Sequence, residues 1–219
     1  MHAFWSQVVD EATNSTEYSG IFYARWDGER WSSPRAVFTS PDESYLNPAV
    51  AYSQDDRLLL SWIGSETGLL YYSWAIPARA LRPDDWTLPQ AVPVPRPAAS
   101  SPFILPGVNG VMGIVYAIPV NEMRGVYLVQ SDDGGGTWSV PALVFDGAQA
   151  GWEMVDRPRL ARTGDGVLQT IFERYSQPGG SGSLGIYTAR SLDGGQTWDY
   201  DHLGRDGQYN GTLITASMA

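Results

Sequence analysis

The chain has 219 residues, which is enough for one domain, or a tight pair, with a buried core. It carries 14 basic residues, all of them Arg, against 24 acidic residues, and its formal net charge of −10 repels nucleic acids and anionic membranes. It has no Cys and only two His, which excludes disulfides and thiol chemistry and argues against a zinc site.

The hydropathy pattern also argues against a membrane-spanning segment. No apolar run approaches the roughly 20 residues that span a bilayer, and the opening MHAFWSQVVDE lacks the basic and apolar regions of a signal peptide. From the acidic charge and the hydropathy, we expect neither a nucleic acid nor a membrane as partner. From the lack of Cys and of His pairs we expect no metal, and we also expect no cofactor.

Four tryptophans mark an internal repeat. RWSSPRAVF (30–38), DWTLPQAV (85–92) and TWSVPALVF (137–145) each contain Trp, a hydroxyl residue, any residue, Pro and then an apolar run. A fourth copy, TWDYDHLG (197–204), keeps the Trp and loses the Pro. Trp31, Trp86, Trp138 and Trp198 are spaced by 55, 52 and 60 residues. This period is too long for a solenoid turn and suits a four-stranded propeller blade.

In chain order, the predicted blades are residues 1–38, 44–92, 99–145 and 156–204 of a single domain, 1–219. The second shows the whole pattern, because NPAVAYS, LLLSWIG, LLYYSWA and WTLPQAV are short apolar or aromatic runs separated by polar segments, as expected for strands. The first blade starts with HAFWSQVV, which matches second strands, so it lacks its innermost strand. Residues 211–219, GTLITASMA, match a first strand without a blade to follow.

Two segments carry a more specific pattern. SDDGGGTW (131–138) and SLDGGQTW (191–198) both match Ser-x-Asp-x-Gly-x-Thr-Trp, and ARWDGERW (24–31) and RPDDW (82–86) are degenerate versions. The motif resembles the Asp-box, or BNR repeat, of bacterial-type sialidases and related β-propellers. The resemblance implies an all-β β-propeller of four-stranded antiparallel blades, with about four blades in this chain.

The ends of the chain leave two alternatives for the ring. Either residues 211–219 complete the first blade, or the chain is part of a larger ring, and the resemblance favours the second because sialidase rings are usually larger. An incomplete ring exposes strand edges, so we expect completion by further blades or by a second copy.

Physical chemistry explains the motif as a turn. Asp133 and Asp193 are expected to accept hydrogen bonds from backbone N–H groups, and Gly135 and Gly195 to adopt positive φ. The Trp that ends each motif is expected to pack between neighbouring blades. In the resembled architecture these turns lie on the face opposite the active site, so functional residues are expected at the other end of the blades.

The richest segments for that other end are GWEMVDRPRL (151–160) and FERY (172–175). Sialidases hold the substrate carboxylate with three Arg, use a Tyr activated by Glu as nucleophile, and use Asp as acid/base. Arg suits the first task because its fork binds carboxylates in bidentate fashion. The resemblance implies these candidates: Arg157 and Arg174 as carboxylate ligands with Arg124 as the third; Glu153 or Glu173 as the partner of the Tyr; Tyr209 or Tyr175 as nucleophile; and Trp152, Asp156, Tyr175 and Arg124 as ligand-binding residues.

The motif set departs from that of sialidases in one respect. The Arg-Ile-Pro start motif is missing, and DRPRL, which places Arg157 directly before Pro158, is only loosely similar. Three functions therefore stay open: recognition of a glycan or another small polar ligand without catalysis, which we favour, an exo-glycosidase of sialidase type, and a structural scaffold. The resemblance also implies a secreted or cell-surface protein.

Overall fold

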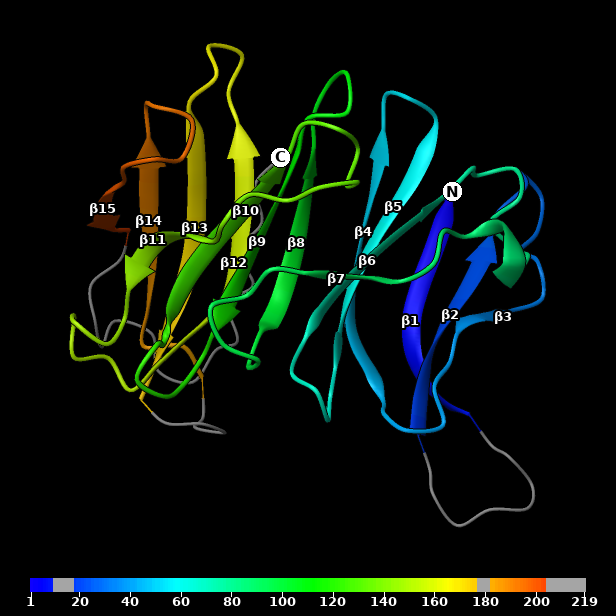
Figure 1. Cartoon of the computed structure of the whole chain (residues 1–219), viewed down its shortest axis with the longest axis horizontal. Helices are drawn as coiled ribbons and strands as arrows, with labels where there is room; N and C mark the ends of the chain where they lie inside the picture. The colour runs from blue at the N-terminus through cyan, green and yellow to red at the C-terminus, as the bar shows by residue number, and fades with distance from the viewer. Residues whose placement is uncertain (10–17, 177–181, 204–219) are drawn as a thin grey trace.

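The protein is built almost entirely of antiparallel sheets. The computed structural model describes residues 1–9, 18–176 and 182–203, and these form four sheets that stand side by side in chain order (Figure 1). The predicted fold class, an all-β propeller of antiparallel blades, is confirmed. Three of the sheets have four strands and the first has three.

Strand bounds follow the repeat closely. The first sheet contains β1 (His2–Val9), β2 (Tyr18–Arg25) and β3 (Arg35–Phe38). The second contains β4 (Tyr45–Ser53), β5 (Arg57–Gly64), β6 (Leu70–Ala75) and β7 (Gln90–Val92), with a short 3-10 helix, η1 (Pro83–Asp85), before β7. The third contains β8 (Ser100–Pro106), β9 (Met112–Ile118), β10 (Gly125–Ser131) and β11 (Ala142–Asp146). The fourth contains β12 (Met154–Arg162), β13 (Leu168–Tyr175), β14 (Gly185–Ser191) and β15 (Asp199–His202).

The core lies between successive sheets. On β5, Leu60 and Trp62 pack in the cluster shared with the first sheet, whereas Leu59 and Ile63 pack in the cluster shared with the third. Successive strand residues point to opposite faces, so a central strand covered on both faces reads as a continuous apolar run. Trp62 is fully buried, which stabilises the fold by roughly 3 kcal/mol.

The two Ser-x-Asp-x-Gly-x-Thr-Trp segments form matching turns between the third and fourth strands of their sheets. Asp133 Oδ1 accepts hydrogen bonds from the Thr137 N–H (2.9 Å) and the Ser131 hydroxyl (2.8 Å). These bonds hold the pKa of Asp133 at about 2, the Thr137 contacts being the largest cause. Gly135 adopts φ +91°. Asp193 makes the same set of bonds in the other turn.

The Trp of each turn packs toward the preceding blade. Trp138 meets Tyr72 of the second sheet edge to face, with ring centroids 5.2 Å apart. Tyr72 in turn donates its hydroxyl hydrogen to the carbonyl oxygen of Gly134, at 3.1 Å. Trp198 packs against the cluster between the third and fourth sheets. The turns are therefore anchors between blades.

A β-bulge interrupts the innermost strand of each four-stranded sheet. The register shifts between Leu46 and Ala49, between Ser100 and Phe103, and between Asp156 and Arg159. In each bulge, two residues lie opposite one, and the first of the two has positive φ and precedes Pro: Asn47 (52°), Ser101 (46°) and Arg157 (55°). Such bulges re-aim the side chains of a strand and are common beside active sites.

Two of the predictions concern segments that the structure does not describe. Tyr209 and the predicted strand 211–219 both lie outside the described residues. Within the described ranges, no helix is long and apolar enough to cross a membrane.

Candidate functional site

The fourth sheet carries charge at a position where the second and third sheets are uncharged. Just before each bulge, the paired residues are Leu46 with Ile63 in the second sheet and Ser100 with Ala117 in the third. In the fourth sheet, the corresponding pair is Asp156 with Glu173. Because burial of a charge is costly unless it is paired, this replacement needs a reason other than packing.

Glu173 is buried and has two partners. Its side chain is 4% exposed. The Tyr175 hydroxyl donates a hydrogen bond to Oε2 at 2.8 Å, and Arg157 Nη1 lies 3.9 Å from the same oxygen. The Arg157 guanidinium also lies over the Tyr175 ring, 5.6 Å from its centroid. Since the Arg157 side chain is 42% exposed, it connects the buried carboxylate with solvent.

Tyr175 is held in its protonated form. Burial is the main cause that raises the pKa of its hydroxyl, and the hydrogen bond to Glu173 raises it further. At neutral pH Tyr175 is therefore a hydrogen-bond donor, and proton removal from it requires a change in its surroundings.

Arg159 joins the same face of the sheet because of the bulge. Asp156 pairs with Glu173 and Arg159 pairs with Ile171, so both lie on the face of β13 that carries Glu173. Burial lowers the pKa of Arg159, and the negative charge of Glu173 opposes this effect. Its guanidinium lies 5.5 Å from the ring centroid of Phe103 in the third sheet. Sequence reasoning missed Arg159, although it stands in the DRPRL segment, because the strand was taken as regular. The signal that could have found the bulge is Pro158, since Pro also follows the first bulge residue in the second and third sheets.

The carboxylate oxygens of Asp156 can accept more hydrogen bonds than they do within the described residues. Its Oδ2 accepts only a long hydrogen bond, 3.5 Å, from the Ser100 hydroxyl of the third sheet. Its Oδ1 is buried and has no hydrogen-bond partner among the described residues. An unpaired buried carboxylate oxygen costs free energy, which a ligand hydroxyl or a water that donates to it would recover.

Together, Asp156, Arg157, Arg159, Glu173 and Tyr175 form what we call the blade-4 cluster. Its two carboxylates and two guanidinium groups balance in charge, and it offers both donors and acceptors. It lies away from the Asp193 turn: β13 pairs Leu168 with Ser191, and Glu173 is five residues further along, roughly 17 Å at about 3.3 Å per residue. Within the part of the chain that the structure describes, no group of three His, Asp or Glu is arranged to hold a metal ion.

The structure places the other candidate residues apart from this cluster. Arg174 lies on the opposite face of β13 from Glu173, because neighbouring strand residues alternate. There its guanidinium lies 5.4 Å from the centroid of the Trp152 ring. Arg124 also belongs to this second group, since its Nε donates to the Trp152 carbonyl and its Nη1 to the Asn121 carbonyl at 2.7 Å. Arg157, Arg174 and Arg124 therefore do not form one carboxylate clamp.

Trp152 is a core residue. It is 7% exposed, and its ring packs against Phe145 (4.4 Å between centroids) and Tyr187 (4.4 Å). The ring faces that a bound sugar would need are therefore covered. Glu153, the next residue, is exposed to solvent and is no part of the blade-4 cluster. Tyr209, as noted above, lies outside the described residues.

Comparisons with known proteins give the fold. No family model and no curated protein matches the sequence. Among solved structures, a protein of unknown function from Dyadobacter fermentans superposes with a TM-score of 0.65 at 19% identity, over 91% of this chain and 63% of that protein. A sialidase from Streptococcus pneumoniae gives 0.61 at 12% identity, over 97% and 51%. An α-L-arabinofuranosidase from Podospora anserina gives 0.59 at 12%, over 94% and 64%.

These proteins share the architecture of this chain and are longer than it. The neighbours are glycoside hydrolase propellers and a related protein of unknown function, so the chain has a sialidase-like propeller fold. It spans less than two thirds of the length of each of these three proteins. At such low sequence identities, the likeness shows the fold, and function has to be argued from the residues of the site.

Proposed function

We propose that the chain is a carbohydrate-recognition module whose ligand binds at the blade-4 cluster. The observation that supports this best is the buried Glu173 with its partners, at a position that is Ile63 and Ala117 in the preceding sheets. In those sheets an apolar residue fills the position, so packing alone does not require a carboxylate there. A pair of carboxylates, one of them buried, at this position in only one of the three four-stranded sheets is better explained by a ligand.

The chemistry of the cluster suits the hydroxyl groups of a sugar. Asp156 and Glu173 accept hydrogen bonds, Tyr175 and the two arginines donate them, and the charges balance, so no charged ligand is required. The fold is shared with proteins described as a sialidase and as an α-L-arabinofuranosidase. We further propose that the turns at 131–138 and 191–198 are Asp-boxes, which leaves the opposite end of the blades for ligands.

Hydrolysis of a glycosidic bond is a second candidate, favoured by one contact. The hydrogen bond of 2.8 Å from Tyr175 to Glu173 is the pair that a sialidase-type nucleophile would need. Against it, the raised pKa of Tyr175 disfavours the deprotonated nucleophile, and Arg174, one of the three arginines expected to hold a carboxylate, lies on the other face of β13. Recognition without catalysis is therefore the better supported of the two.

The decisive variant is Arg157→Asn. Asn47 occupies the corresponding bulge of the second sheet with positive φ, so Asn at 157 keeps the backbone geometry and removes the guanidinium. Arg162→Asn, at an exposed arginine near the end of the same strand, is the matched control. Screening on an array of neutral and sialylated oligosaccharides, followed by calorimetry with the best binder, measures the effect.

We expect the Arg157→Asn variant to lose about tenfold or more in affinity, and the Arg162→Asn variant to bind as the natural chain does. Binding that survives Arg157→Asn, or the absence of any glycan that binds, would contradict the proposal. Release of the fluorophore from a fluorogenic sialoside or arabinofuranoside, abolished by Tyr175→Phe, would instead favour hydrolysis.

A further inference from the structure

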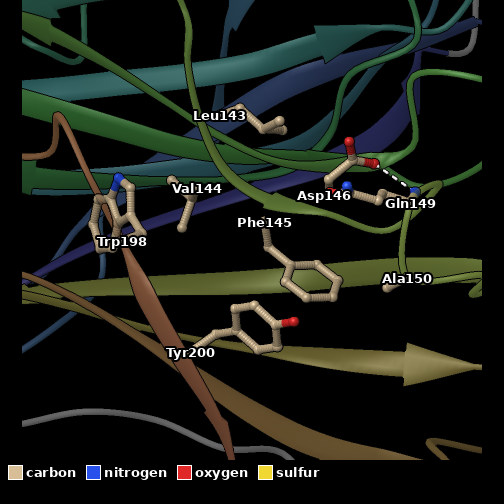
Figure 2. Close-up of a pocket in the computed structure, with 8 residues that line it drawn as sticks. All are labelled: Leu143, Val144, Phe145, Asp146, Gln149, Ala150, Trp198 and Tyr200. Atoms are coloured by element: carbon tan, nitrogen blue, oxygen red, sulfur yellow. Dashed lines mark hydrogen bonds between the residues drawn. The ribbon is translucent and has the colours of Figure 1, made fainter.

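A second candidate site lies on the outer wall of the propeller, between the outermost strands of the third and fourth sheets. A cavity of about 360 Å³ opens between β11 and β15 there. Figure 2 shows its lining: the aromatic rings of Phe145, Tyr200 and Trp198 lie on one side and the polar groups of Asp146 and Gln149 at the other end. Its volume is in the range of pockets that hold small ligands, about 300–1,000 Å³.

The aromatic side of the cavity is fixed and open. Tyr200 is 64% exposed and meets Phe145 edge to face, with centroids 5.2 Å apart. Trp198 is half-buried, and its indole N–H donates to the Gly195 carbonyl oxygen at 3.1 Å, which sets the orientation of the ring. Exposed Tyr gains little from solvent, whereas a rigid aromatic ring beside a cavity offers a large contact area at low entropic cost.

The polar end of the cavity is also held in place. Asp146 Oδ1 accepts a hydrogen bond from the backbone N–H of Gln149 at 2.8 Å (Figure 2). A carboxylate accepts about four hydrogen bonds, so capacity remains for the hydroxyls of a ligand. The side chain of Gln149 adds an amide donor and acceptor at the exposed rim. None of the lining residues is cationic, so the cavity disfavours an acidic ligand.

The wall between the first and second sheets has a cavity with a different lining. Between the first and second sheets, a larger cavity of about 710 Å³ is lined by residues of segments 32–36 and 81–83. Those residues are Ser, Arg, Ala, Leu and Pro, without an aromatic ring or a carboxylate. The wall between the third and fourth sheets thus combines two features of a ligand site that the other wall lacks.

We propose that this cavity binds a neutral sugar residue, which stacks against Tyr200 and donates hydroxyl hydrogens to Asp146. The inference does not rest on the blade-4 cluster, which lies on the innermost strand and its neighbour, whereas this cavity lies on the outermost strands. A glycan chain bound here would be held on the side of the propeller, away from its axis.

The test uses the indole N–H of Trp198, assigned in ¹H–¹⁵N spectra of the whole chain with a Trp198→Phe variant. L-Arabinose, D-xylose, D-galactose and D-glucose are titrated singly. We expect at least one of them to shift the Trp198 signal. The affinity for that sugar should fall about tenfold in Tyr200→Ala and several-fold in Asp146→Asn. It should be nearly unchanged in Tyr200→Phe, which keeps the ring.

Two controls separate this site from other causes. Tyr52→Ala removes another exposed tyrosine, 55% exposed on β4, and Arg157→Asn disables the blade-4 cluster; both should leave the Trp198 shift in place. The proposal is overturned if none of the four sugars shifts the signal, or if Tyr200→Ala binds as well as the natural chain. A dimer in light scattering that Tyr200→Ala dissociates would assign the cavity to a second copy and would also overturn it.

Discussion

The buried pair of Tyr175 and Glu173 allows stability and function to be separated in one experiment. In the double variant Glu173→Ile/Tyr175→Phe, the residue of the second sheet, Ile63, replaces the carboxylate, and its hydrogen-bond donor is removed at the same time. Removing only one partner leaves a buried polar group unsatisfied, which costs about 1–3 kcal/mol. Replacing both by apolar groups is often neutral or stabilising.

The magnitudes follow from the contacts. The ion pair of Glu173 with Arg157 is long, 3.9 Å, and Arg157 is 42% exposed, so its loss costs only about 0–1 kcal/mol. The double variant loses the hydrogen bond from Tyr175, but it also no longer buries the two polar groups. Arg159 loses the negative charge of Glu173 and keeps that of Asp156. We therefore expect the double variant to unfold in urea with a free energy within about 1 kcal/mol of the natural chain, whereas Tyr175→Phe alone loses about 1–3 kcal/mol.

Glycan binding is measured on the same samples by calorimetry. The double variant should not bind, although it is as stable as the natural chain. A loss of more than about 3 kcal/mol in the double variant would show that the cluster is structural. Retained binding would show that the ligand lies elsewhere, and either result would refute the reasoning.

The turns give two further predictions. The pKa of Asp133 is depressed in the folded chain, so the stabilising contribution of its carboxylate is complete above the ordinary Asp value near 4 and is lost as the pH falls toward 2. In calorimetric scans, the difference in melting temperature between the natural chain and Asp133→Asn should therefore shrink over this pH range. A difference that stays constant would contradict this prediction. Gly135→Ala should destabilise the fold by several kcal/mol, because its φ is positive and the new Cβ would lie 2.2 Å from the buried Tyr72 ring. Gly194→Ala, with φ +74° and no atom within 4 Å of its Cβ, should cost only about 1 kcal/mol, and equal losses in urea unfolding would refute the packing argument.

The fold could be predicted from the sequence because its signals are local and repeated. Each Trp stands at a fixed place in its repeat, and the Asp, Gly and Thr of residues 131–138 specify their turn through contacts within a few residues. The apolar runs of the central strands follow from burial on both faces. None of these features depends on how distant segments are placed relative to one another, which is why the sequence alone was sufficient.

The site could be predicted only in part, and the bulge is the reason. A regular strand would place Asp156 and Arg159, three residues apart, on opposite faces. The extra residue at Arg157 brings them to the same face, beside Glu173. The Pro that follows the first bulge residue in all three strands, Pro158 in this one, is the sequence sign of an irregular strand, and a prediction that treats DRPRL as a regular strand misplaces Arg159. By the same alternation, Arg174 follows Glu173 in sequence and lies on the other face.

The repeats also provide a way to find functional residues without related sequences. Ile63, Ala117 and Glu173 occupy one position in three sheets, and packing alone would accept an apolar residue in each. Burial of Glu173 lowers stability relative to an apolar residue unless its partners compensate fully. A position at which one repeat departs from the others, toward a costlier buried residue, is therefore a position where a requirement other than stability acts. A comparison of cavities likewise favours the site at Tyr200 and Asp146 over the cavity between the first two sheets. Both candidate sites are therefore better targets for mutagenesis than the residues that recur in every repeat.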